Sequence, residues 1–223
     1  RLAVTDHFAS NFLIDHLRSF HTRHPRIELS LITGVGLTDL SRGEADIAVR
    51  FARPGGVPVS RGNDDLRAQR VCRIGVSVYG SRDYLDHRGR PERADDVRGH
   101  DLIVAREEAR FMPGYDWTTK TLPHNRVCMR TDGLSGMAVA ASAGFGLCAL
   151  PVFVAIRHPH LERIDPPDTI DSRDAWLLMP PELRRVARVR AVWDFLTELF
   201  DHWEPLMSGR IRPEAAKRML AAK

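Results

Sequence analysis

Short apolar segments with the two-residue period of β-strands alternate along this chain with segments of helical periodicity. Residues 2–4 form a first apolar run, and the apolar positions that follow, up to Phe20, recur at helical spacing. Residues 27–31 and 45–51 then alternate as strands do, with a glycine-containing break between them. Because parallel strands need long crossover connections, usually helices, this order predicts βαβ units and a largely parallel sheet.

A long extended stretch separates this series from a second one. Residues 66–79 keep an apolar alternation beyond the length of an ordinary strand, which is typical of a strand that crosses between two lobes. Further along, the same patterns predict strands at residues 102–105, 127–131 and 175–179, and helices at residues 82–87, 134–143 and 189–203. The sequence therefore predicts an α/β fold with two lobes.

The composition is that of an ordinary globular protein. Hydrophobic residues make up 43% and charged residues 28% of the 223 positions. The 33 basic and 29 acidic residues are scattered, so the net charge of +4 predicts a mixed solvated surface rather than a nucleic-acid-binding patch. The sequence has neither an apolar run of about 18 residues nor a signal-peptide pattern, which predicts no membrane span and no export.

The cysteines indicate the compartment. Cys72, Cys128 and Cys148 are an odd number at wide spacing, and each has apolar neighbours. This pattern favours small buried thiols over a disulfide framework. We therefore expect a reducing, cytoplasmic location.

Three stretches in fixed order resemble a known family. The first is TDHFA at residues 5–9, followed by a helix that ends in FHTRHP at residues 20–25. The second, LSRGEADIAVR at residues 40–50, is the most specific. The third combines residues 132–136 with AASAGFGLCALP at residues 140–151. In order and spacing, about nine-tenths of the chain is similar to the effector-binding domain of LysR-type transcription regulators.

The resemblance implies an architecture and a set of partners. The fold would be two Rossmann-like lobes of the type 2 periplasmic-binding-protein class, joined by two crossover strands. Lobe I would comprise residues 1–75 and 182–205, lobe II residues 76–181, and residues 206–223 a C-terminal tail. A small effector would bind in the interlobe cleft, and the chain would form a homodimer or homotetramer. DNA would be bound only through a winged helix-turn-helix domain preceding residue 1, which this chain lacks.

Independently of the family, an open α/β sheet collects ligands at the carboxyl ends of its strands. The candidate ligand-binding residues are those that follow or end the predicted strands: Thr5, Asp6, His7, Phe8, Thr33, Gly34, Arg50 and Phe51 in the first lobe, and Arg106, Thr131 and Asp132 in the second. We expect no cofactor and no metal ion at these positions.

The chemistry of these residues favours a carboxylate-bearing effector. Helix N-termini attract anions, and Arg50 and Arg106 could each bind a carboxylate through two hydrogen bonds. Asp6 would instead suit an amine-bearing ligand; it stands where the family commonly has a small residue or proline, and His7 stands near positions where the family has hydroxyl residues. Simpler roles also remain open.

These simpler roles are helix capping, ion pairing and solvation. Thr131 and Asp132 could merely cap the following helix. Arg50 could pair with Asp46 or Glu44, and a loop histidine such as His7 is more often solvated than functional.

Other functions find less support in the sequence. There is no GxSxG elbow, GxGxxG loop or P-loop, so we expect no enzyme. His21 and His24 could share a helix face, but His16 points elsewhere, which disfavours a metal site. A solute-binding protein of a transporter, which shares the two-lobed architecture, and a dimerisation module with an empty cleft remain alternatives.

Overall fold

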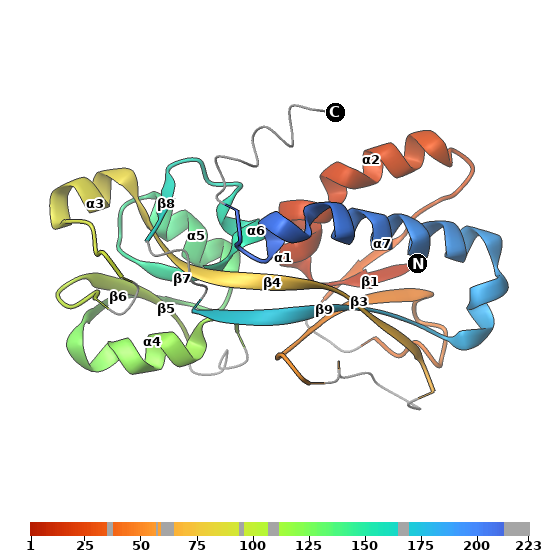
Figure 1. Ribbon diagram of the computed structural model, residues 1–223, viewed down its shortest axis with the longest axis horizontal. Helices are drawn as coiled ribbons and strands as arrows, with labels where there is room; N and C mark the ends of the chain where they lie inside the picture. Colours follow the sequence, from red (N-terminus) through yellow and green to blue (C-terminus); the bar gives the residue numbers. More distant parts are fainter. Residues whose placement is uncertain are drawn as a thin grey trace. The chain divides into compact units, whose positions relative to one another are not determined.

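The computed structural model resolves two compact units connected by strands that pass from one to the other (Figure 1). It describes residues 1–34, 38–56, 58, 65–93, 96–106, 112–164 and 170–211. Unit 1 contains Arg1–Arg73 and Arg173–Glu204, and unit 2 contains Ile74–Ser172 and the chain from Pro205 onwards. Strands β4 (Arg67–Ser81) and β9 (Asp171–Met179) each begin in one unit and end in the other.

Unit 1 is built on a mixed sheet. Strand β1 (Leu2–Val4) pairs in parallel with β2 (Leu31–Thr33) and with β3 (Ile47–Ala52), so the largely parallel sheet predicted from the sequence is found in this part of the sheet only. On its other side β3 pairs antiparallel with β9. Strand β2 begins at Leu31 rather than at the expected position 27, because β1 provides partners only from Leu2, whose register partner is Leu31.

Two helical segments cover one face of this sheet. Residues 6–23 form a continuous helical stretch made of α1 (Asp6–Phe8), a π-helical turn η1 (Ala9–Leu13) and α2 (Ile14–Arg23). The long helix α7 (Ala187–Met207) lies beside it (Figure 1). Phe20 and Phe195 pack together with their ring centroids 5.2 Å apart, so aromatic contacts join the two segments.

Helix α7 confirms the predicted amphipathic helix and extends it. The apolar stripe from Val189 to Trp203 is buried. The helix continues past Pro205 to Met207, whose side chain is fully buried, and Gly209 follows with a φ of 80°. A left-handed glycine just beyond the last turn is a common way to end a helix. Of the segment 206–223 assigned to a tail, residues 212–223 lie outside the described residues.

Unit 2 combines two pairings of strands. The second part of β4 pairs antiparallel with β7 (Cys148–Pro151) and β8 (Leu161–Arg163). Strand β5 (Asp101–Ala105) pairs in parallel with β6 (Arg126–Thr131), as the alternation of strands and helices predicts. The helices are α3 (Arg82–Arg88), α4 (Tyr115–Thr121) with a 3₁₀ turn η3 (Leu122–His124), α5 (Leu134–Ser142) and α6 (Val152–Ala155).

The core of unit 2 lies between these strands and helices. Buried side chains from β4, β5 and β7 meet there, among them Val76, Leu102 and Ala149, and Trp117 of α4 packs against them. Helix α4 has no clear apolar stripe in the sequence. It is anchored instead at Gly114, which adopts a φ of 81° and donates its N–H to the Asp171 carboxylate at 2.9 Å.

The 3₁₀ turn η4 (Pro181–Arg185) leads into α7. Its Arg184 and Arg185, together with Arg188 and Arg190 of α7, are exposed, as expected for the outer face of a helix. Among the described helices none is both long enough and apolar enough to cross a lipid bilayer.

Candidate functional site

In unit 1, the turn after β1 is shaped by Thr5. Its carbonyl accepts hydrogen bonds from the backbone N–H groups of Phe8 and Ala9 at 3.1 and 3.0 Å, so the helix begins directly after the strand. The Thr5 side chain makes no capping hydrogen bond. Its hydroxyl is therefore available to a ligand at the strand end. Asp6, the next residue, is exposed.

The side chain of Phe8 anchors this turn to helix α7. Its ring is fully buried and stacks on Phe200 of α7 with the centroids 5.4 Å apart and an interplanar angle of 5°. Phe51 at the end of β3 meets the same ring edge-on at 5.2 Å. Burying side chains of this size contributes about 1.5–3 kcal/mol each. Phe8 and Phe51 thus hold the strand ends of unit 1 in fixed positions.

His7 lies half-buried in the same turn. Burial lowers the pKa of its imidazole, because desolvation disfavours the charged form more than the neighbouring Asp6 favours it. Its backbone carbonyl accepts a hydrogen bond from the Asn11 side chain at 2.9 Å. His7 is therefore suited to a neutral hydrogen-bonding role near neutral pH.

The ends of β1 and β2 lie side by side. Val4 is the register partner of Thr33, so Thr5, which follows Val4, and Thr33 stand at the adjacent ends of the two strands. Thr33 and Gly34 are both exposed. The structure thus brings together the residues that the sequence predicted after the first two strands.

Arg50 lies on β3 and is half-buried. Its Nη1 donates to the Val49 carbonyl at 3.4 Å, and burial lowers the pKa of its guanidinium. The two acidic residues proposed as its ion-pair partners are engaged elsewhere. Asp46 binds the amino group and side chain of Arg1 at 2.7 and 2.8 Å, and Glu44 accepts the Asp39 N–H at 2.7 Å.

In unit 2, the ends of β5 and β6 are also adjacent. Ala105 is the register partner of Thr131, and the Arg106 N–H donates to the Thr131 carbonyl at 3.0 Å. The side chains of Arg106 and Asp132 are exposed, and Thr131 is half-buried. A cation, a hydroxyl and a carboxylate therefore stand at one strand edge, at the start of α5.

The Thr131 hydroxyl rests against the first turn of α5. It lies 3.4 Å from the N–H of Gly133, the N-cap residue, and a Cβ placed at Gly136 would be only 2.6 Å from it. The N-cap itself has no side-chain hydrogen bond. The glycine at position 136 thus creates the space that the Thr131 hydroxyl occupies.

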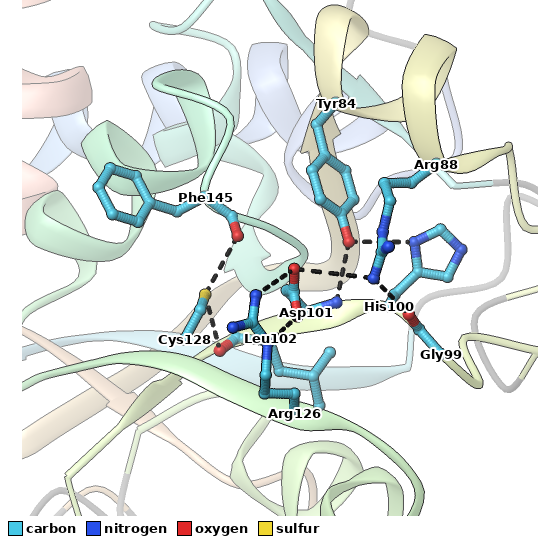
Figure 2. Close-up of polar contacts among 9 residues, drawn as sticks. All are labelled: Tyr84, Arg88, Gly99, His100, Asp101, Leu102, Arg126, Cys128 and Phe145. Atoms are coloured by element: carbon cyan, nitrogen blue, oxygen red, sulfur yellow. Dashed lines mark hydrogen bonds and ion pairs between the residues drawn. The ribbon is translucent and has the colours of Figure 1, made fainter.

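A separate polar cluster lies at the opposite ends of β5 and β6 (Figure 2). Asp101 accepts two hydrogen bonds from Arg126 at 2.7 and 2.9 Å, and Arg88 approaches the same carboxylate at 3.8 Å. The Tyr84 hydroxyl accepts the Asp101 N–H at 2.9 Å. Hydrogen bonding to Arg126 holds the pKa of Asp101 below its ordinary value. This cluster ties α3 to both strands; nothing in the residue pattern had indicated it.

Cys128 belongs to the same region and occupies a β-bulge. The register shifts between Leu102 and Ile103, so Cys128 has no partner on β5, and its thiol donates to the carbonyls of Leu102 and Phe145 (Figure 2). Burial raises the pKa of this thiol. All three cysteines are free, and Cys72 and Cys148 are buried, as the sequence predicted.

His16, in the helical stretch, is surrounded by aromatic side chains. His16 packs between Phe12 and Trp203, with ring centroids 4.5 and 5.1 Å away. Within the described parts of the chain, no group of three or more His, Cys, Asp or Glu side chains is arranged to hold a metal ion.

Comparison with known proteins shows which family has this architecture. The family model described as the LysR substrate binding domain matches residues 1–201. The Mau operon transcriptional activator of Paracoccus denitrificans is 27% identical over 202 residues, which cover 90% of this chain and 64% of the activator. PgrR, an HTH-type transcriptional regulator of Escherichia coli, is 30% identical over 104 residues, which cover 46% of this chain and 32% of PgrR. The chain thus spans less than two thirds of the length of these relatives.

Solved structures agree on the fold. The regulatory domain of CrgA, a LysR-type transcriptional regulator from Neisseria meningitidis, superposes with a TM-score of 0.68 at 21% identity and covers 89% of this chain and 97% of its own. The full-length virulence activator AphB of Vibrio cholerae gives a TM-score of 0.68 at 16% identity, over 90% of this chain and 67% of AphB. The predicted fold, two lobes of the type 2 periplasmic-binding-protein class, is confirmed.

The family match also bears on the alternatives raised by the sequence. The family is one of transcription regulators and not of enzymes. It favours a regulator over a solute-binding protein of a transporter. The match covers both strand edges that carry the candidate residues, since it runs from residue 1 to residue 201. This chain belongs to the family of LysR substrate-binding domains.

Proposed function

We propose that this chain is the ligand-sensing domain of a transcription regulator and that it binds a small carboxylate-bearing effector at its strand ends. The observation that carries the proposal is the gathering of ligand-binding groups at the carboxyl edge of the sheet in each unit. Thr5 and Thr33 stand at the adjacent ends of β1 and β2 in unit 1, and the Arg106 backbone is bonded to Thr131 in unit 2. In open α/β sheets, this edge is where ligands bind.

The carboxylate preference follows from charge and hydrogen-bond donors. Arg106 is an exposed cation at the edge of unit 2, next to the beginning of α5, where backbone N–H groups favour an anion. In unit 1, the free hydroxyl of Thr5 can donate to a carboxylate oxygen. Asp6 limits the choice, because its carboxylate repels a bare anion, so an acid that also carries an amine is a second class to test.

The proposal is tested by a thermal-shift screen of the 223-residue chain against small carboxylic acids and amino acids. A ligand that binds only the folded state raises apparent stability by RT ln(1 + [L]/Kd), which is about 2.7 kcal/mol at a hundredfold excess over Kd. Thr5→Ala and Thr131→Ala should each abolish the shift. The matched control is Thr119→Ala, which removes an exposed threonine of α4 whose hydroxyl bonds to its own helix at Tyr115. A uniformly flat screen would contradict the proposal.

We also propose that the chain forms a homodimer, in which a second copy covers its exposed apolar side chains. The large hydrophobic side chains that are exposed in the described residues are Ile14 on α2 and Val139 and Phe145 at α5. Val139 is 60% and Phe145 48% exposed. Val139 lies on α5 and Phe145 three residues after its end, and a partner that covers them would remove exposed apolar surface from water.

The remaining parts of the proposal concern the longer protein. DNA binding would reside in a segment outside this chain, consistent with the chain spanning 64% of the length of the Mau operon activator. The free, largely buried thiols support a reducing compartment such as the cytoplasm. Lobes I and II would correspond to units 1 and 2, and the limits predicted at residues 75 and 182 stay predictions.

A further inference from the structure

Two buried hydrogen-bond donors on one face of the unit 1 sheet have no acceptor. The Nη2 atom of Arg50 and the Nε1 atom of Trp176 are both buried, and neither has a hydrogen-bond partner within the described part of the chain. Arg50 is the direct register partner of Trp176 in the antiparallel pair of β3 and β9. Residues paired in this way project from the same face, with Cβ atoms about 5 Å apart. The two side chains are therefore neighbours on this face.

Neither side chain can satisfy the other. A guanidinium and an indole N–H donate hydrogen bonds and accept none. Buried donors in folded proteins nearly always have an acceptor, and leaving a charged donor without one is especially unfavourable. Within the described part of the chain, no acceptor faces these two donors, and the positive charge of Arg50 favours an anionic one.

A carboxylate on this face, that of Asp174, is paired with other arginines. Asp174 lies two residues from Trp176 on β9 and therefore projects from the same side of the sheet. It is buried, with Arg70 at 2.9 Å and Arg73 at 4.0 Å from its carboxylate. Its negative charge is balanced by these two arginines, which leaves the charge of Arg50 for another partner.

Small side chains flank Arg50 on β3. Ala48 and Ala52 lie two residues before and after it on β3, on the same face. Along β3, Ala48 belongs to a packed apolar cluster with Leu178, whereas Arg50 and Ala52 are half-buried. The donor pair thus lies between this apolar cluster and the buried Asp174.

We propose that Arg50 and Trp176 form a two-donor site for one carboxylate group, with Nη2 and Nε1 each donating a hydrogen bond to its oxygens. The inference rests on the proposed function in one respect, that this carboxylate belongs to the effector. It adds Trp176 as a specificity-determining residue. An amide or ester offers only a neutral carbonyl acceptor and leaves the charge of Arg50 uncompensated, so the pair selects acids over their amides or esters.

The test uses the indole N–H of Trp176 as a direct reporter. The chain has four tryptophans, so a ¹H–¹⁵N spectrum shows four indole signals, and the one lost in Trp176→Phe belongs to Trp176. Sodium benzoate is titrated into the chain, with benzamide as the uncharged analogue and sodium chloride at matched ionic strength as the blank. We expect benzoate to move this signal saturably, and benzamide and chloride to leave it in place.

The variants separate the two donors from the rest of the chain. Arg50→Met should weaken benzoate binding at least tenfold, and Trp176→Phe should weaken it while it retains the aromatic ring. Trp193→Phe is the matched control, because it removes a buried indole that packs under Arg67 at 4.7 Å and is not part of the pair. Its benzoate affinity should equal that of the unmodified chain.

Distinct results would overturn the inference. An indole signal of Trp176 that does not respond to benzoate, or responds equally to benzamide or chloride, contradicts it without any variant. A signal moved by inorganic phosphate but not by benzoate contradicts the carboxylate preference.

The inference and the proposed function can fail separately. If an acid from the thermal-shift screen keeps its full effect in Arg50→Met and Trp176→Phe, the proposed function stands and the donor pair is refuted. If benzoate binds at Trp176 while Thr5→Ala and Thr131→Ala alter no ligand response, the donor pair stands and the proposed site at the strand ends is refuted.

Discussion

Replacing Gly136 by alanine should displace the Thr131 hydroxyl from the place where we expect it to meet the effector. An alanine Cβ would lie 2.6 Å from this hydroxyl, well inside the 3.4–4 Å of ordinary contact. The other Thr131 side-chain atoms are 3.5 and 3.6 Å away, so rotation of the threonine relieves the clash. Rotation also breaks the 3.4 Å contact with the Gly133 N–H.

Two opposing contributions determine how Gly136→Ala changes the free energy of unfolding. Alanine is favoured over glycine inside a helix by about 1 kcal/mol. Forcing Thr131 away from its position costs a comparable amount, about 0.5–1.5 kcal/mol. Gly136→Ala alone should therefore change the free energy of unfolding by less than about 1 kcal/mol. In a Thr131→Ala background the clash is absent, and the same substitution should stabilise the chain by about 1 kcal/mol.

The assay is urea unfolding of the four proteins in a double-mutant cycle. We expect a coupling free energy of about 1 kcal/mol between positions 131 and 136, within the range for residues in contact. Effector-induced stabilisation should be lost in Gly136→Ala as completely as in Thr131→Ala. Additive stabilities would refute the predicted contact, and full effector binding by Gly136→Ala would refute the role of the Thr131 hydroxyl.

Three further predictions concern packing, pH and assembly. Phe8→Ala should destabilise the chain by about 3–5 kcal/mol, measured by urea unfolding, because it removes the fully buried ring that stacks on Phe200. The lowered pKa of Asp101 contributes stability that is complete above the pKa of an unfolded aspartate, about 3.9, and is lost as pH falls through the folded value. The loss of urea midpoint in Asp101→Asn should therefore be largest at pH 7 and shrink as the pH falls below about 3.9, and a loss that does not depend on pH would contradict the Arg126 pairing. Val139→Asp should convert a dimer to a monomer in light scattering, whereas an unchanged mass would show that this patch is not the interface.

Much of the fold could be predicted because its signals are local. The alternation of residues 45–51 anticipated β3, and the apolar stripe of residues 189–203 anticipated α7, since both elements bury one face against a core. The start of β2 could not be placed correctly, because it depends on which residues of β1 are available to pair. Helix α4 escaped detection because Gly114 and a distant Asp171 fix its start.

Some residues of the candidate site could likewise be predicted from local sequence signals, and others could not. Residues that follow strands could be found from the strand ends alone, and the structure places Thr5 and Thr33 at adjacent strand ends and bonds the Arg106 N–H to Thr131. Their role in binding stays a prediction. Trp176 carries no local signal, because its proximity to Arg50 arises from the antiparallel pairing of β9 with β3, strands far apart in the sequence. Long-range antiparallel pairing leaves no trace in the periodicity of either strand.

Amide hydrogen exchange, measured with and without the acid that stabilises the chain most, tests the central claim most directly. We predict that the acid slows exchange at residues 5–8, 33–34, 106 and 131–133. Exchange rates at the opposite ends of β5 and β6, around Asp101 and Arg126, should stay unchanged. Protection centred on Asp101 and Arg126, or no acid that changes exchange anywhere, would contradict effector binding at the strand ends.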